Sequence, residues 1–141
     1  MKIGSLLALA ALATAAAAHA EPPKKAVLLD FSRDSLIDAA SAKAVLAEGI
    51  PARVWKVYPA AKWAFASQVE GGVTPAGMCV VTARVMMVQL TQAMKAPLLR
   101  PEKIATAFDA AAGASQEQCR QMAKTKLAEA TQSVVSSLVK P

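Results

Sequence analysis

The chain has 141 residues, a length that suits one domain with a modest hydrophobic core. Its formal net charge is +6, from 16 basic and 10 acidic side chains. The basic residues form no compact run interleaved with aromatic residues, which argues against a nucleic-acid-binding protein.

The N-terminal segment has the pattern of a secretory signal peptide. After Lys2, an uncharged run rich in Leu and Ala extends to Ala18 and is followed by His19, Ala20 and a Pro-rich stretch. Signal peptidase reads small residues such as Ala18 and Ala20, so we expect cleavage after Ala20. The run is shorter and richer in Ala than a retained membrane anchor, which needs about 20 apolar residues.

Cleavage would place residues 21–141 in the periplasm or outside the cell, as a single domain that does not span the membrane. It would also remove His19, the only histidine of the chain. The remaining residues hold 15 basic and 10 acidic side chains, which suits an acidic protein or another anionic component of the envelope as the partner. We expect no nucleic-acid partner there, and the same charge also serves solubility.

The first two predicted elements are a strand and a helix. Residues 26–31 form a short apolar run of strand type, and residues 35–48 have apolar positions at helical spacing. Ser32 or Asp34 is the expected N-cap of this helix, and the sequence Gly49-Ile50-Pro51 is expected to end it.

Three runs of β type follow, over residues 53–58, 62–70 and 78–90. The connections between them are short enough for an antiparallel meander. We then expect a short helix over residues 101–112 and a long final helix, for which Ser115 is the N-cap.

The two cysteines, Cys79 and Cys119, are both expected on buried faces. Cys79 has the strand parity of Val81 and Val85, and Cys119 belongs to the apolar stripe of the final helix. An even number of cysteines in an oxidising compartment favours a disulfide, which would join the sheet to the helix that covers it. Two thiols without a histidine make an incomplete zinc site, so we expect no metal and no cofactor.

These elements predict an α+β fold. Its antiparallel sheet has three or four strands, its elements run in the order β-α-β-β-β-α-α, and its helices pack against one face. One disulfide joins the two layers, and the other face of the sheet is open.

This open face is the candidate binding surface. Alternation along the predicted strands places polar side chains there: Lys56, Tyr58, Lys62, Gln68, Glu70, Thr82 and Arg84. The candidate contact residues among them are Lys56, Tyr58, Lys62, Gln68 and Arg84. Arg84 and Lys62 would anchor the charge of a partner, although an ordinary solvated sheet face has the same pattern.

An alternative site lies between the sheet and the helices, where a carrier would hold a small molecule or a lipid. Its expected lining is apolar: Trp55, Trp63, Phe65 and Met87. Aromatic residues at strand parity also suit an ordinary core.

The residues after the signal segment carry no catalytic motif. The loss of His19 excludes Ser-His-Asp, Cys-His and the common zinc hydrolase sites, and neither a G-x-S-x-G motif nor a P-loop occurs. A carboxylate pair such as Glu70 and Asp109 is one acid-base arrangement left open.

We therefore expect a non-enzymatic envelope protein that works by contact with another protein. Inhibitors, immunity proteins and accessory factors of a secretion or surface apparatus are proteins of this kind. A carrier of small molecules or lipids is the alternative, and the sequence does not determine the oligomeric state.

Overall fold

A computed structural model of the chain describes Pro23 and residues 26–139, so the expected signal peptide, residues 1–20, lies outside the described residues. The described elements are, in chain order, β1 (Val27–Asp30), α1 (Ala39–Gly49), α2 (Ala52–Val57), β2 (Trp63–Val73), β3 (Met78–Leu90), β4 (Pro97–Ala112) and α3 (Gln116–Leu138). This is an α+β fold, as predicted.

The strands form one mixed sheet in the spatial order β1-β2-β3-β4. β2, β3 and β4 are antiparallel neighbours, whereas β1 pairs with β2 in parallel, with Val27 opposite Ala64. The prediction of a wholly antiparallel sheet is therefore wrong. β1 and β2 are parallel because the crossover through α1 and α2 returns the chain to the same end of the sheet before β2 begins.

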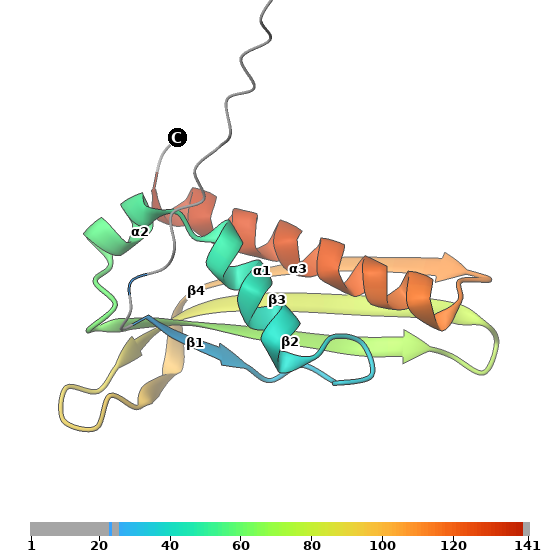
Figure 1. The fold of residues 1–141 in the computed structure, drawn as a ribbon, viewed down its shortest axis with the longest axis horizontal. Coiled ribbons are helices and arrows are strands. Elements are labelled where there is room, and N and C mark those ends of the chain that lie inside the picture. Colours follow the sequence, from blue (N-terminus) through green and yellow to red (C-terminus); the bar gives the residue numbers. More distant parts are fainter. Residues whose placement is uncertain (1–22, 24–25, 140–141) are drawn as a thin grey trace, which may run out of the picture.

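The three helices lie on one side of the sheet, and the hairpin that joins β3 to β4 bends towards the other side (Figure 1). The pairing of β3 with β4 shifts register between Met87 and Leu90, at the base of this hairpin. Irregular pairing of this kind bends a strand and increases its twist. The bend gives the sheet its curled shape.

α1 begins later than predicted. Its N-cap is Asp38, whose Oδ1 accepts a hydrogen bond of 2.8 Å from the backbone N–H of Ser41. Ser32 and Asp34 lie before this cap, in the segment that joins β1 to α1. The helix ends at Gly49, as predicted.

Residues 52–57 form helix α2, where the sequence predicted a strand over residues 53–58. Apolar and polar side chains alternate only from Trp55 to Val57, around Lys56, and so short a pattern does not distinguish a strand from a helix. Val54 and Trp55 are neighbours in sequence and both are buried in the helical layer, with exposed fractions of 0% and 8%. Burial of this adjacent pair favours the helix.

The segment predicted as a short helix, residues 101–112, is instead the main part of β4. It is rich in Ala and also contains Glu102 and Lys103, residue types that favour helices in isolation, but it pairs with β3. Ala105 and Ala107 pack against the main core, where their small side chains let α3 lie close to the strand. Tertiary pairing here overrides local propensity.

The main core lies between the sheet and the helices, and α3 supplies much of it. Ser115 caps α3 and Gln118 completes the capping box. Cys79 and Cys119 are fully buried and joined by a disulfide, with their Cα atoms 5.7 Å apart across 40 residues of sequence. The predicted link between sheet and helix is confirmed.

None of the helices in the described part of the chain is both long and apolar enough to cross a membrane.

Candidate functional site

The helices leave the opposite face of the sheet uncovered (Figure 1). Part of this face, near the hairpin that joins β3 to β4, is buried in a second small cluster that includes Ala64 and Val88. We call this opposite face the outer face. Strand pairing places Gln68 of β2, Arg84 of β3 and Thr106 of β4 side by side on it. By alternation its residues are Ala64, Ala66, Gln68, Glu70, Val80, Thr82, Arg84, Met86, Val88, Ile104, Thr106, Phe108 and Ala110.

Four polar side chains of the outer face line a small hollow of about 40 Å³: Gln68, Glu70, Thr82 and Arg84. We call them the polar quartet. Nε2 of Gln68 donates a hydrogen bond of 2.8 Å to Oε1 of Glu70. Within the described residues Arg84 makes no ion pair, and it is exposed. Its guanidinium group is available to a carboxylate of a partner.

Apart from Thr106, the rest of the outer face is apolar. Ile104 and Phe108 of β4 are 55% and 63% exposed, which is unusual for large apolar side chains on a sheet. A second hollow, of about 220 Å³, opens beside the bent hairpin and is lined by Leu29, Phe31, Ala66, Met86, Val88, Pro97, Leu98 and Pro101. Phe31 and Leu98, at its rim, are 61% and 42% exposed.

Sequence reasoning missed these apolar residues. Residues 101–112 were expected to form a helix, in which Ile104 and Phe108 belong to one apolar stripe and would have been buried. The signal that identifies them is the alternation of Ile104, Thr106 and Phe108 with small alanines, which is a strand pattern. Phe31 follows β1 directly and extends the same apolar surface.

Of the five predicted contact residues, the structure brings Gln68 and Arg84 together and separates the other three. Lys56 and Tyr58 belong to α2 and its C-cap, on the helical side of the sheet, because residues 52–57 form no strand. Lys62 precedes β2 and lies about 20 Å from Gln68 along the strand direction, at about 3.4 Å per residue. Arg84 and Lys62 therefore do not form one cationic patch.

The alternative pocket between the sheet and the helices is occupied by its own side chains. Phe65 and Met87 are fully buried, and Trp63 packs at the margin of the same cluster. The ring of Trp55 meets the ring of Phe65 edge-on, with centroids 5.3 Å apart. These four residues are packed as core, and within the described residues the indole N–H of Trp55 has no hydrogen-bond partner.

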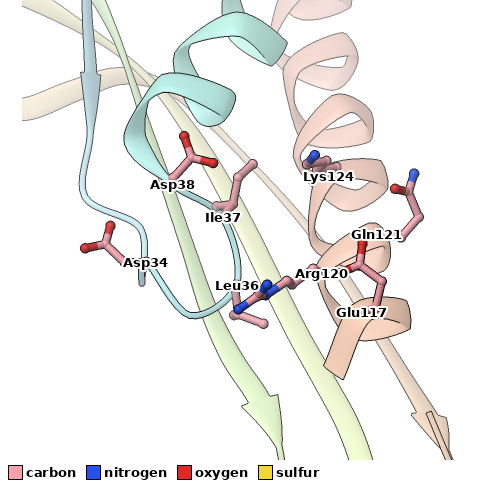
Figure 2. A pocket seen from close by; sticks show the side chains of 8 residues that line it. All are labelled: Asp34, Leu36, Ile37, Asp38, Glu117, Arg120, Gln121 and Lys124. Atoms are coloured by element: carbon pink, nitrogen blue, oxygen red, sulfur yellow. The ribbon is translucent and has the colours of Figure 1, made fainter. Parts of the chain in front are cut away.

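A larger and more polar hollow, of about 330 Å³, lies on the helical side between the loop before α1 and the first turns of α3. Figure 2 shows Asp34 and Asp38 on one side of it and Lys124 of α3 on the other. Nε of Arg120 donates a hydrogen bond of 3.1 Å to the carbonyl oxygen of Ser35, so this guanidinium group fastens the loop to α3. The arrangement is that of a structural junction.

Asp38 also has a structural role in this hollow. Hydrogen bonds from the hydroxyl and the backbone N–H of Ser41 lower the pKa of Asp38, because they stabilise its carboxylate as the cap of α1. An acid held in this way is a poor proton donor or acceptor for catalysis.

The two carboxylates that the sequence left open as an acid-base pair lie on opposite sides of the sheet. Glu70 belongs to the polar quartet on the outer face. Oδ2 of Asp109 lies 3.2 Å from Nζ of Lys126, a residue of α3 on the helical side. The sheet separates Glu70 from Asp109, so they cannot act on one substrate. Across the described ranges, no three His, Cys, Asp or Glu side chains gather where they could hold a metal ion.

No protein-family model and no curated protein matches the chain significantly. Among solved structures, the chain is similar to the PelC dodecamer from Paraburkholderia phytofirmans, at 13% identity and a TM-score of 0.41, over 80% of this chain and 92% of that one. It is also similar to a candidate lipoprotein from Caulobacter crescentus CB15, at 12% identity and a TM-score of 0.35, over 78% of this chain and 82% of that one. At such identities and TM-scores neither name transfers to this chain.

Proposed function

We propose that this protein is a non-enzymatic binding protein of the cell envelope, exported and cleaved after Ala20, and that its outer face contacts another protein. The observation that carries the proposal is the exposure of large apolar side chains on that face, with Phe31, Ile104 and Phe108 each more than half exposed. Contiguous exposed apolar surface on a small protein marks a site of interaction.

The polar quartet supports the same proposal, because it places charged and hydrogen-bonding groups of β2 and β3 between Phe31, which follows β1, and Phe108 of β4. In protein interfaces apolar contacts supply most of the free energy of binding, and polar groups fix the orientation. The quartet holds one cation, Arg84, and one anion, Glu70. The partner that suits it has an apolar contact surface with a carboxylate or amide group placed for Arg84. A purely acidic surface fits less well.

A non-enzymatic role fits the polar groups on both sides of the sheet. Asp38 caps α1 and Arg120 fastens a loop, so two of the charged groups that line the hollow of about 330 Å³ already have structural roles. The hollow of about 220 Å³ on the outer face is smaller than most ligand pockets, which hold about 300–1,000 Å³. A protein side chain is a better occupant of such a hollow than a lipid.

The proposal is tested by site-specific photo-crosslinking in the envelope. Phe31 and Phe108 are each replaced by benzoylphenylalanine, which keeps an aromatic side chain at an exposed position. Gln132, exposed on α3, is replaced in the same way as the matched control. We expect one protein to be crosslinked from Phe31 and Phe108 and not from Gln132, and to be lost when Arg84→Glu is added.

Two results contradict the proposal. Crosslinking of the same protein from Gln132 with equal yield would place the contact elsewhere. The second is a small molecule retained by the purified protein in native mass spectrometry and lost after Phe31→Glu, which would support a carrier.

A further inference from the structure

β4 is the last strand of the sheet, so within the described residues one of its long edges has no neighbouring strand. Such an edge presents a row of backbone N–H and C=O groups to any strand that approaches it. Pro101 limits pairing to the residues that follow it, because proline donates no backbone hydrogen bond. The usable edge is residues 102–112.

The sequence of this edge is self-complementary about Thr106. Lys103 and Asp109 lie three residues to either side of it, and Ile104 and Phe108 lie two residues to either side. In an antiparallel pair of identical strands centred on Thr106, Lys103 of each copy lies opposite Asp109 of the other. Ile104 lies opposite Phe108 in the same way. Opposite charges and apolar side chains in these positions stabilise a strand pair.

We propose that two copies of this chain associate by antiparallel pairing of their β4 edges, with the two-fold axis at Thr106. The association goes beyond the proposed contact with a different protein and does not depend on it. Closed two-fold pairs are the commonest assemblies of identical chains, and each copy contributes the same surface.

Other registers lose this complementarity. A shift of one residue towards the N-terminus places Glu102 opposite Asp109, which sets two like charges together. A shift of two residues in either direction leaves Lys103 opposite an alanine. A shift of one residue also turns the helices of the two copies to opposite sides of the joint sheet.

The register centred on Thr106 keeps the two outer faces on one side and the two α3 helices on the other. On the outer side, Ile104 of each copy would lie beside Phe108 of the other, which reduces their 55% and 63% exposure at the side and leaves the face above them uncovered. On the α3 side, the small side chains of Ala105 and Ala107 lie opposite each other.

The charges at this edge would form an alternating series. Within one copy Nζ of Lys126 lies 3.2 Å from Oδ2 of Asp109 and 2.9 Å from Oε1 of Glu129. Lys103 of the second copy would add a cation on the free side of Asp109. The order would then be Lys103, Asp109, Lys126 and Glu129, in which each charge has an opposite neighbour.

The first experiment uses a cysteine at the proposed axis. Both natural cysteines are joined in the disulfide, so Thr106→Cys introduces the only free thiol. Residues opposite each other in an antiparallel pair have Cα atoms about 4.5–5.5 Å apart, within the range that a disulfide spans. We expect a covalent dimer on a non-reducing gel. Ala110→Cys, on the same face, is the control and should run as a monomer on the same gel. Residue 110 lies far from the axis in both copies, so its two thiols could not meet.

The second experiment reverses one charge at a time. Lys103→Glu and Asp109→Lys should each weaken self-association of the purified protein at least about ten-fold. Light scattering over a range of concentrations measures this. Each variant places like charges opposite each other on both sides of the two-fold axis. Lys56→Glu, on α2, makes the same charge change as Lys103→Glu and should have no effect. An equimolar mixture of Lys103→Glu and Asp109→Lys should restore the dimer, because both opposed pairs then have opposite signs.

A lysine on an edge strand can also serve to block pairing, and in that case the wild-type protein is monomeric at every concentration. That result overturns the proposal. So does covalent dimer formation by Ala110→Cys that equals that of Thr106→Cys, or a dimer that Lys103→Glu leaves intact. If Asp109→Lys fails to fold, two other comparisons test the proposal. One compares Thr106→Cys with Ala110→Cys, and the other compares Lys103→Glu with Lys56→Glu.

Discussion

Lys126 of α3 joins Asp109 of β4, with 3.2 Å between Nζ and Oδ2, and so fastens the last helix to the edge of the sheet. The hydrogen bond from Lys126, another from the backbone N–H of Ala110 and the charge of the ammonium group lower the pKa of Asp109 below its ordinary value. The folded state therefore binds a proton at Asp109 more weakly than the unfolded state does.

This pKa shift predicts a pH dependence of stability. The contribution of Asp109 is fully present above its unfolded pKa and is lost as pH falls through its lower, folded pKa. Asp109→Asn should therefore destabilise the protein at neutral pH, and its difference from the wild type should shrink towards strongly acidic pH. Urea unfolding at a series of pH values measures this. Glu102→Gln removes a carboxylate from the same strand but leaves the contact with Lys126, and it should not reproduce the effect.

The disulfide should supply a large part of the stability. Cys79 and Cys119 close a segment of 40 residues, and removing a disulfide of this kind typically costs about 2–4 kcal/mol. The double variant Cys79→Ala with Cys119→Ala should unfold at correspondingly lower urea. Reductant should lower the midpoint of the wild type and leave that of the variant unchanged. Equal urea midpoints for the oxidised wild type and the variant would show that the disulfide does not stabilise the folded protein.

Trp55 is buried, and its indole N–H finds no partner in the part of the chain that the structure describes, which predicts an unusual response to substitution. A buried donor without a partner costs about 1–3 kcal/mol, so its removal compensates for lost packing. Trp55→Phe should change the free energy of unfolding by less than about 1 kcal/mol, whereas Trp55→Ala should cost about 3–5 kcal/mol because it leaves a cavity. A large loss in Trp55→Phe would indicate that the indole N–H does find a partner.

The sequence predicted those elements whose local signals agree with their tertiary surroundings. Ser115 and Gln118 are both a sequence pattern and the observed cap of α3. Cys79 and Cys119 both followed the parity of buried positions, and the structure places both in the core. In each case one short segment contains all the information that the prediction needs.

The two segments whose secondary structure was predicted wrongly are those in which long-range contacts determine it. β4 has the composition of a helix, and only its pairing with β3 makes it a strand. α2 has the alternation of a strand only from Trp55 to Val57, and the burial of Val54 together with Trp55 favours a helix. Because Ile104 and Phe108 lie on β4, the same error concealed the apolar half of the candidate site. The polar half at Gln68 and Arg84 could be found, since β2 and β3 were recognised.

The end of β2 contains two glycines that should respond differently to the same substitution. Gly71 and Gly72 both have positive φ angles, of 122° and 139°. A Cβ atom at Gly71 would lie 1.9 Å from the carbonyl oxygen of Val80, whereas one at Gly72 would meet no atom within 4 Å. Gly72→Ala carries only backbone strain, about 1–3 kcal/mol. Gly71→Ala should cost about 1–3 kcal/mol more, from the steric clash. Equal costs in urea unfolding would contradict the close approach of β2 to β3 at Gly71.

Arg84 offers the sharpest test of the polar quartet. The side chain is exposed and makes no ion pair within the described residues, so Arg84→Glu should change the free energy of unfolding by less than about 0.5 kcal/mol. The same change should abolish capture of the envelope partner, because it sets a carboxylate where the partner presents its own. Circular dichroism and thermal melting check the fold, and crosslinking from Phe31 measures capture.

Lys62→Glu is the matched comparison for Arg84→Glu, since both replace an exposed cation with a carboxylate. Lys62 lies about 20 Å from Gln68 along the sheet, beyond the distance of about 8 Å over which charges act at physiological ionic strength. Lys62→Glu should therefore leave capture intact. Loss of capture in both variants would mean that the overall positive charge attracts the partner, and addition of salt should then weaken the wild-type complex strongly. Loss in Arg84→Glu alone would locate the contact at the polar quartet.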